Sequence, residues 1–238
     1  MEAILSELLG RATGVSKGKG GSMHLYGDEF YGGNGIVGAQ VPIGAGIAFA
    51  QKYLGEKACC FTLYGDGAAN NGQVFETFNI AKLWSLPCVF VCENNRFGMG
   101  TSVDRASAST AFYTRGDFIA GVKVDGMDFA AIYAASLWAK EWAISGNGPV
   151  ILEMDTYRYQ GHSVSDPGTS YRTRKEIKQV RQERDPKNIL KERILAAEAA
   201  TEQEIEAFDA EAKEQVEKAL EKAKNAPFPQ DSELFTDV

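Results

Sequence analysis

Gly65-Asp66-Gly67-Ala68-Ala69-Asn70-Asn71-Gly72 joins an apolar run to a helical pattern and is the most informative segment for the fold. The apolar run spans residues 58–64, and apolar side chains recur at helical spacing after the stretch. A second apolar run, at residues 88–92, ends at Glu93-Asn94-Asn95. A strand, a helix and a second strand of these lengths predict a parallel pair with a right-handed crossover. We therefore expect an α/β fold with a mainly parallel sheet.

Asp66 and Asn95 are candidate metal ligands. Each follows a predicted strand, and open α/β sheets bind ligands where the carboxyl ends of neighbouring strands meet. Carboxylate and amide oxygens suit Mg²⁺, which takes about six oxygens and leaves positions for phosphate. A helix that starts near Asn71 would direct its free amide groups at the same place. Asp-Gly and Asn-Gly are also common in surface turns, so this prediction depends on the two motifs occurring together.

The composition argues against several classes of function. The chain has 238 residues, of which 44% are hydrophobic, which is enough for one sizeable core. The net charge of −7 argues against nucleic acid as a partner. No apolar run reaches the roughly 18 residues that a membrane helix needs, so we expect no membrane contact. The cysteines fall in predicted buried strands at spacings poor for zinc, so we expect reduced core residues: Cys59, Cys60, Cys88 and Cys92.

The remaining α/β region alternates helices, strands and loops. The pattern predicts helices at residues 4–12, 40–54 and 127–144, strands at 122–124 and 149–154, and loops at 13–35, 100–118 and 157–174. A long loop without regular structure, such as residues 157–174, is more typical of a functional segment than of a simple connection.

A charged helical tail follows, with breaks near Pro186 and Thr201. Thr201 and Glu204 are spaced as a capping box. An apolar stripe comes next: Ile205, Phe208, Ala212, Val216, Ala219 and Ala223. We therefore expect an α/β domain at residues 1–174 and a helical C-terminal extension at residues 175–238, packed on the same domain or on a partner subunit.

Longer strings of the sequence resemble one enzyme family. Gly65-Asp66-Gly67 with Asn94-Asn95 is similar to the motif of thiamine diphosphate enzymes. Four strings resemble the alpha subunits of the decarboxylating component of pyruvate dehydrogenase: Lys19-Gly20-Gly21-Ser22-Met23-His24, Tyr31-Gly32-Gly33-Asn34-Gly35-Ile36-Val37-Gly38-Ala39-Gln40-Val41-Pro42, Tyr157-Arg158-Tyr159-Gln160-Gly161-His162-Ser163 and Ser165-Asp166-Pro167-Gly168-Thr169-Ser170-Tyr171-Arg172-Thr173-Arg174. The resemblance covers nearly the whole chain and is weakest in the last segment. It implies a doubly wound thiamine diphosphate-binding fold, thiamine diphosphate and Mg²⁺ as cofactors, and oxidative decarboxylation of pyruvate with transfer of the acetyl group to a lipoyl domain.

The resemblance also implies roles for individual residues. The implied metal ligands are Asp66, Asn95 and the backbone carbonyl of Phe97; the diphosphate would contact Gly67 and Ala68, and the aminopyrimidine Gly35 and Val37. His162 would be catalytic, because it would lie near the reacting carbon and assist acyl transfer to the lipoyl arm. Gln160 stands where many relatives have a second histidine.

Partners and regulation are implied in the same way. Family members form alpha2beta2 heterotetramers with a beta subunit, which supplies a proton-relay glutamate, and they pass the acetyl group to a lipoyl-bearing acetyltransferase component. Ser163, Ser170 and Ser102 match positions that are phosphorylated to switch the enzyme off, which implies a regulatory kinase and phosphatase. The sequence of the loop at Pro167-Gly168-Thr169-Ser170-Tyr171-Arg172 resembles that of mitochondrial members of the family. It implies a location in the mitochondrial matrix, although no transit peptide is visible. The family's usual front segment, with its Tyr-Arg pair, has no counterpart here, so the domain is expected to lack it.

Three other interpretations are open at this stage. Gly44-Ala45-Gly46 before a helix, with Asp66 further on, could belong to a dinucleotide-binding dehydrogenase, although Pro42 precedes the glycines and a third glycine is missing. A branched-chain 2-oxoacid dehydrogenase alpha subunit would share the fold and the cofactor. The third interpretation is a truncated, non-catalytic assembly subunit, because the family's front segment has no counterpart in this sequence.

Overall fold

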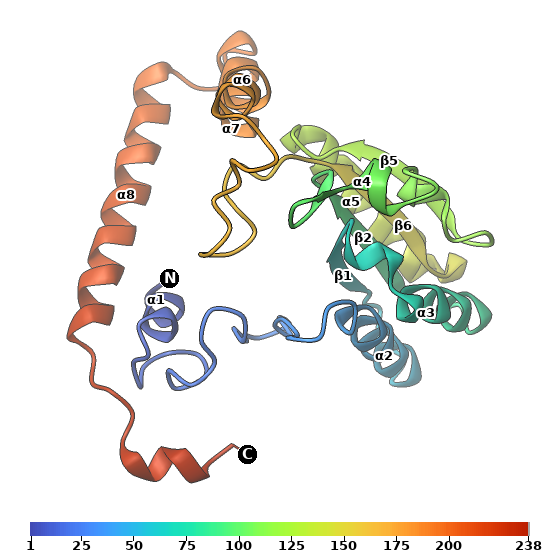
Figure 1. Ribbon diagram of the computed structural model, residues 1–238, viewed down its shortest axis with the longest axis horizontal. Helices are drawn as coiled ribbons and strands as arrows, with labels where there is room; N and C mark the ends of the chain where they lie inside the picture. Colours follow the sequence, from blue (N-terminus) through green and yellow to red (C-terminus); the bar gives the residue numbers. More distant parts are fainter. Residues whose placement is uncertain (238) are drawn as a thin grey trace. The chain divides into compact units, whose positions relative to one another are not determined.

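Four parallel strands form the central sheet (Figure 1). In this computed structural model, which describes residues 1–237, the strand order is β1 (Cys60–Gly65), β2 (Cys88–Asn94), β6 (Val150–Asp155) and β5 (Ala120–Asp125). The register pairs Gly65 with Glu93, and both Asn94 and Asp125 with Asp155, so the carboxyl ends of the strands are level. The predicted α/β fold with a mainly parallel sheet is confirmed.

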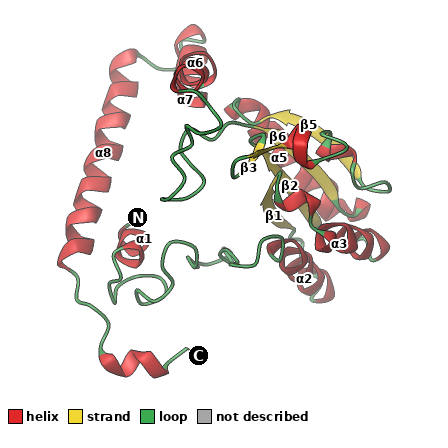
Figure 2. Ribbon diagram, viewed as in Figure 1, coloured by secondary structure: helices red, strands yellow, loops and turns green. Residues whose placement is uncertain are grey.

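Helices cover both faces of this sheet, as Figure 2 shows. They are α2 (Gln40–Tyr53), α3 (Gly72–Leu83) and α5 (Phe129–Trp142). Phe90 in β2 packs in the cluster that contains α2 and α3 side chains, with its ring centroid 4.7 Å from that of Phe78. Val89 and Val91 point to the opposite face, since side chains alternate along a strand, and pack in a cluster with α5.

The crossovers make the sheet doubly wound. The connection from β1 to β2 passes through α3 on one face, and that from β5 to β6 passes through α5 on the other. The strand order therefore reverses between β2 and β6, where Asn94 pairs with Asp155. Ligands of open α/β sheets bind outside the carboxyl ends of the strands near such a reversal.

Gly44 allows α2 to pack closely on the sheet. A Cβ at Gly44 would lie 2.5 Å from the side chain of Thr62, so α2 lies close against β1. Gly44 and Gly46 are inside the helix. A dinucleotide fingerprint needs its glycines in a strand-to-helix turn, and the dehydrogenase interpretation based on them is therefore wrong.

The chain divides into two compact units, which are described separately. The larger unit, residues 36–193, contains the sheet, and the smaller joins residues 1–35 to the segment from residue 194 onward. The division expected between residues 174 and 175 stays a prediction, because compactness within one chain does not define an independently folding domain. Two helices follow the sheet, α6 (Arg174–Arg184) and α7 (Pro186–Ala196), with the break at Pro186 as expected.

In the smaller unit, α1 (Glu2–Leu8) packs on α8 (Glu202–Asn225). Thr201 and Glu204 form the predicted capping box at the start of α8. The apolar stripe of α8 is buried only at Ala219 and Ala223, while Phe208 is 66% exposed. The stripe therefore packs on α1 near its end and leaves its first half uncovered among the described residues.

The glycine-rich loop after α1 is held by a buried carboxylate. Glu7 is 1% exposed and accepts hydrogen bonds from the backbone amides of Ser16, Gly18 and Gly20 at 2.7, 2.9 and 2.6 Å. A carboxylate with several amide donors is a well-satisfied buried charge. The loop is therefore ordered.

Several boundaries differ from the sequence predictions. The expected polar loop at residues 100–118 contains short elements: β4 (Thr101–Ser102), which pairs with β3 (Phe97–Gly98), α4 (Val103–Ala106) and a 3₁₀ turn, Phe112–Thr114. Cys59 precedes β1 and is half-buried, whereas the other three cysteines are buried, and all four are free thiols. Within residues 1–237, no helix has the length and apolar character to cross a bilayer.

Candidate functional site

Asp66, directly after β1, carries a buried carboxyl oxygen that lacks a partner. The residue is 2% exposed, and its Oδ1 has no hydrogen-bond partner among the described residues. Burial raises the pKa of this carboxyl above its ordinary value, although the backbone amides of Asp66 and Asn95 and the charge of Arg158 oppose the rise. A buried polar oxygen without a partner is rare and requires an explanation. A bound cation would provide one.

The turn after β2 lies against Asp66. A Cβ added to Gly98 would lie 3.1 Å from Cα of Gly67 and 3.9 Å from Oδ2 of Asp66. Only glycines allow the two loops to approach this closely. The β3–β4 hairpin, which begins at Phe97, is thus packed against Asp66 at Gly98, and the backbone amide of Asn95, just before the hairpin, donates to the Asp66 carboxyl group.

Arg158 already contacts two of these expected ligands. Its Nη1 donates to Oδ1 of Asn95 at 3.2 Å and to the carbonyl oxygen of Phe97 at 3.1 Å, and its Nη2 donates to the carbonyl of Met99 at 2.9 Å. An arginine has donors only. The two oxygens therefore converge on one cationic group.

The donor set fits Mg²⁺ better than a transition metal. Among residues 1–237, no group of three or more His, Cys, Asp or Glu side chains is placed to hold a metal ion. One carboxylate, one amide and one carbonyl are hard oxygen donors, and Mg²⁺ commonly takes its other ligands from phosphate and water.

The amino end of α3 adjoins this site. Asn71 caps the helix by accepting from the amide of Gln73 at 2.9 Å, and its Nδ2 donates to the carbonyl of Val37 at 3.1 Å. Gly67 and Ala68 lie between Asp66 and this helix, and Ala68 is buried. The free amides of the first helical turn favour an anion here. Val37 is thus tied to the helix start, while Gly35 belongs to the smaller unit.

The loop after β6 is organised by Asp166. This carboxylate accepts hydrogen bonds from the His162 amide at 2.7 Å, the Gly168 amide at 2.8 Å and the Tyr171 hydroxyl at 2.6 Å. These donors lower the pKa of Asp166 to about 2. Nη2 of Arg158 donates to the same hydroxyl of Tyr171 at 2.9 Å. Arg158 therefore connects this loop to the expected metal ligands.

Of the predicted catalytic and phosphorylated residues, His162, Ser163 and Ser170 are exposed and Ser102 is half-buried. His162 is exposed, and no hydrogen bond or ion pair of its imidazole is present within the described chain. Ser163 and Ser170 are exposed, and Oγ of Ser163 lies 3.1 Å from Oγ of Ser165. Ser102 lies at the end of the β3–β4 hairpin.

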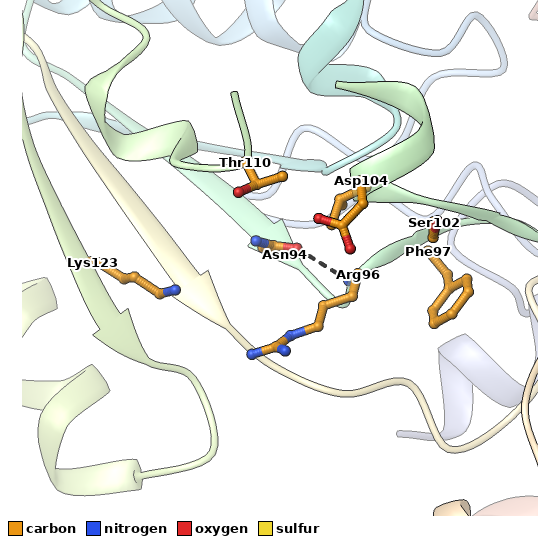
Figure 3. A pocket seen from close by; sticks show the side chains of 8 residues that line it. Asn94, Arg96, Phe97, Ser102, Asp104, Thr110 and Lys123 are labelled. Atoms are coloured by element: carbon orange, nitrogen blue, oxygen red, sulfur yellow. Dashed lines mark hydrogen bonds between the residues drawn. The ribbon is translucent and has the colours of Figure 1, made fainter. Parts of the chain in front are cut away.

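A cavity of about 370 Å³ opens beside the turn after β2 (Figure 3). Asn94, Arg96, Ser102 and Lys123 are among its lining residues. Arg96 also donates from Nη2 to both carboxyl oxygens of Asp155 at 3.1 Å. The cavity therefore lies at the strand-order reversal between β2 and β6.

Sequence reasoning did not assign the residues that hold this site together. Arg158, Asp166 and Tyr171 occur in the quoted motifs, but their contacts join positions far apart in the chain. The sequence signal that could have identified them is that all three occur in one loop rich in charged and aromatic residues.

Comparison with known proteins places the chain in a family. The model of the dehydrogenase E1 component family matches residues 1–232. The chain is similar to proteins named pyruvate dehydrogenase E1 component subunit alpha, mitochondrial: it is 60% identical to that of Kluyveromyces lactis, 58% to that of Saccharomyces cerevisiae and 59% to that of Dictyostelium discoideum. The whole chain is covered in each case, but only 58%, 57% and 63% of the respective relatives, so it spans about three fifths of their length. The chain belongs to the dehydrogenase E1 component family.

Proposed function

We propose that this protein is the alpha subunit of a pyruvate dehydrogenase E1 component, which decarboxylates pyruvate oxidatively and transfers the acetyl group to a lipoyl domain. Membership of the family implies dependence on thiamine diphosphate. The observation that carries the proposal is the buried, unpartnered Oδ1 of Asp66 beside Asn95 and Phe97.

Bound thiamine diphosphate would supply the electron sink for loss of carbon dioxide. Asp66, Asn95 and the carbonyl of Phe97 would hold Mg²⁺, which neutralises part of the diphosphate charge. Gly67 and Ala68, with the amino end of α3, would bind the diphosphate oxygens. Backbone groups of Gly35 and Val37 would orient the aminopyrimidine.

His162 would handle protons during acyl transfer. Its backbone amide is fixed by Asp166 while its imidazole is exposed, so the side chain is free to meet an incoming lipoyl group. Imidazole is the side chain best suited to proton transfer near neutral pH.

The partners follow from the same proposal. A beta subunit would complete the active site in an alpha2beta2 heterotetramer, and a lipoyl-bearing acetyltransferase component would accept the acetyl group. A kinase and a phosphatase would act on Ser163, Ser170 and Ser102. The names of the relatives support the mitochondrial matrix as the location.

The test is metal and cofactor binding together with turnover. The chain, co-purified with a beta subunit, is titrated with Mn²⁺ in the presence of thiamine diphosphate, and free Mn²⁺ is measured by electron paramagnetic resonance. Oxidation of pyruvate and of a branched-chain 2-oxoacid is then followed with an artificial electron acceptor. We expect metal binding and pyruvate turnover, both lost in Asp66→Ala. Asp104→Ala, which removes an exposed carboxylate near the same turn, should retain both.

Failure takes recognisable forms. A preference for the branched substrate would transfer the protein to the sister enzyme. Binding of metal and cofactor without turnover would support a non-catalytic assembly role. No binding of either would reject the proposed site.

A further inference from the structure

Glu153 is a fully buried carboxylate that the proposed chemistry does not use. It lies on β6, is 0% exposed, and its Oε1 accepts a hydrogen bond from Nδ2 of Asn94 at 2.9 Å. Its Oε2 accepts from the backbone amide of Tyr113 at 3.0 Å, and Nζ of Lys123 lies 3.9 Å from Oε1. A carboxylate is costly to bury, so its place at the carboxyl end of the sheet requires a reason.

Glu153 determines which way the amide of Asn94 points. Asn94 is 5% exposed, and its Oδ1 accepts from the backbone amide of Arg96 at 3.1 Å, the dashed line in Figure 3. Oε1 of Glu153 accepts from Nδ2 of Asn94, so the donor side of the amide faces the carboxyl group. The acceptor side then faces Arg96. A flipped amide would lose both hydrogen bonds.

The hydrogen bond to Arg96 holds an unusual backbone conformation. Arg96 has φ of +69°, in the left-handed region that non-glycine residues rarely adopt. The chain bends here between Asn95 and Phe97, whose Oδ1 and carbonyl oxygen, respectively, converge on Nη1 of Arg158. The left-handed turn therefore points both expected ligands in one direction.

We propose that Glu153 is a positioning residue: through the amide of Asn94, it holds the left-handed turn at Arg96 that presents Asn95 and Phe97 as metal ligands. The inference rests on the proposed function for the identity of the bound ion. The left-handed turn at Arg96 is observed in this chain and does not depend on that proposal. Groups of this kind, which orient the ligands of a metal, commonly change metal affinity by about 10- to 100-fold.

The test exchanges the carboxyl group of Glu153 and the amide group of Asn94 between the two positions. Glu153→Gln places one amide group opposite two donors, so either Asn94 or the Tyr113 amide loses its acceptor. Asn94→Asp places two carboxylates in contact. In the double variant, the amide of the glutamine can donate to the new aspartate and accept from Tyr113, while the aspartate still accepts from Arg96. Every hydrogen bond is restored with one buried negative charge.

The measurement is Mn²⁺ affinity with thiamine diphosphate, made on the co-purified complex. We expect each single variant to weaken Mn²⁺ binding by at least about tenfold, and the double variant to return to within about threefold of the unchanged protein. Lys140→Met is the control, because it removes an exposed charge on α5 and leaves Glu153 and Asn94 in place, and it should bind Mn²⁺ normally. A folded double variant that binds Mn²⁺ no more tightly than Asn94→Asp would overturn the inference.

Amide hydrogen exchange at Arg96 separates this inference from the proposed function. Protection of that amide should fall in both single variants and return in the double variant, whether or not metal binds. If the unchanged protein binds no Mn²⁺ but this exchange pattern appears, the proposed function fails and the positioning of the turn stands. If protection falls in Asn94→Asp and does not return in a folded double variant, the inference is rejected in either case. If a single variant does not fold, recovery in the double variant decides the matter.

Discussion

Nη1 of Arg158 donates a hydrogen bond to Oδ1 of Asn95 at 3.2 Å. The same guanidinium reaches the Tyr171 hydroxyl, which is bound to Asp166. One side chain after β6 thus connects the turn after β2 to the loop that carries His162. The two parts of the candidate site are not independent, and a change in one should be detectable in the other.

Arg158→Met should loosen the loop at residues 157–173. The substitution removes all the side-chain hydrogen bonds of the arginine, and we expect a loss of about 1–3 kcal/mol in the free energy of unfolding. Limited digestion with chymotrypsin, which does not cleave at arginine, should cut the loop faster. Arg174→Met, at an exposed arginine where α6 begins, is the control. Equal cleavage of the two variants would contradict the role given to Arg158.

Asp66→Asn should stabilise the metal-free protein and abolish metal binding. Because burial raises the folded-state pKa of Asp66, the folded state binds more protons than the unfolded state, and ionised Asp66 lowers stability at neutral pH. We expect a higher melting temperature at pH 7 in the presence of a chelator, by about 2–4 °C for each kcal/mol gained. The gain should shrink as the pH falls through the raised pKa toward the ordinary value for aspartate. A lower melting temperature at pH 7 would contradict this interpretation, and Asp104→Asn serves as the control.

Asp166 should show the opposite pH dependence. Its folded-state pKa is lowered to about 2, so its contribution to loop order is complete above the ordinary aspartate pKa of about 3.9 and is lost as the pH falls toward 2. Asp166→Asn should expose the loop to cleavage by pepsin at pH 4, and this difference should close near pH 2. A difference that persists at pH 2 would mean that another group orders the loop.

The sequence predicts the β1–α3–β2 unit because its signals are local. Apolar runs, helical spacing and the cap at Asn71 act over a few residues, and the turn motifs fix where Asp66 and Asn95 must lie. The contribution of Glu153 could not be predicted, because a single acidic residue in an apolar strand gives no sign of its partner across the sheet. Arg158 was equally hidden, since its acceptors lie on a turn about 60 residues earlier in the chain.

In the smaller unit, too, local features could be predicted from the sequence and contacts between distant segments could not. The capping box of α8 follows from two residues three apart, whereas the pairing of α1 with the end of α8 joins opposite ends of the chain. The periodicity of apolar residues in the sequence indicates which residues form the apolar face of a helix. It does not say which segment covers that face, and packing of the exposed half of the α8 stripe on a partner subunit stays a prediction.

On the proposed function, a negative charge at Ser163 should inhibit oxidation of pyruvate. The hydroxyl lies 3.1 Å from that of Ser165, and the carbonyl of Ser163 accepts from the Asp166 amide, so a new charge would lie close to an existing carboxylate. Ser163→Glu should reduce pyruvate turnover by about tenfold, which corresponds to roughly 1.4 kcal/mol of repulsion or lost loop order. Ser163→Gln has nearly the same size without the charge and should retain most activity. Unchanged turnover in Ser163→Glu would count against regulation at this position.

The uncovered edge of β1 should affect the aggregation of the purified chain. No described strand pairs with its outer side, and Phe61 and Leu63 are 36% and 50% exposed. An uncovered edge with apolar side chains accepts strands from other molecules. A preparation of this chain alone should therefore aggregate more readily than one in which another polypeptide covers β1, and production together with a subunit partner is the better starting point for every experiment above.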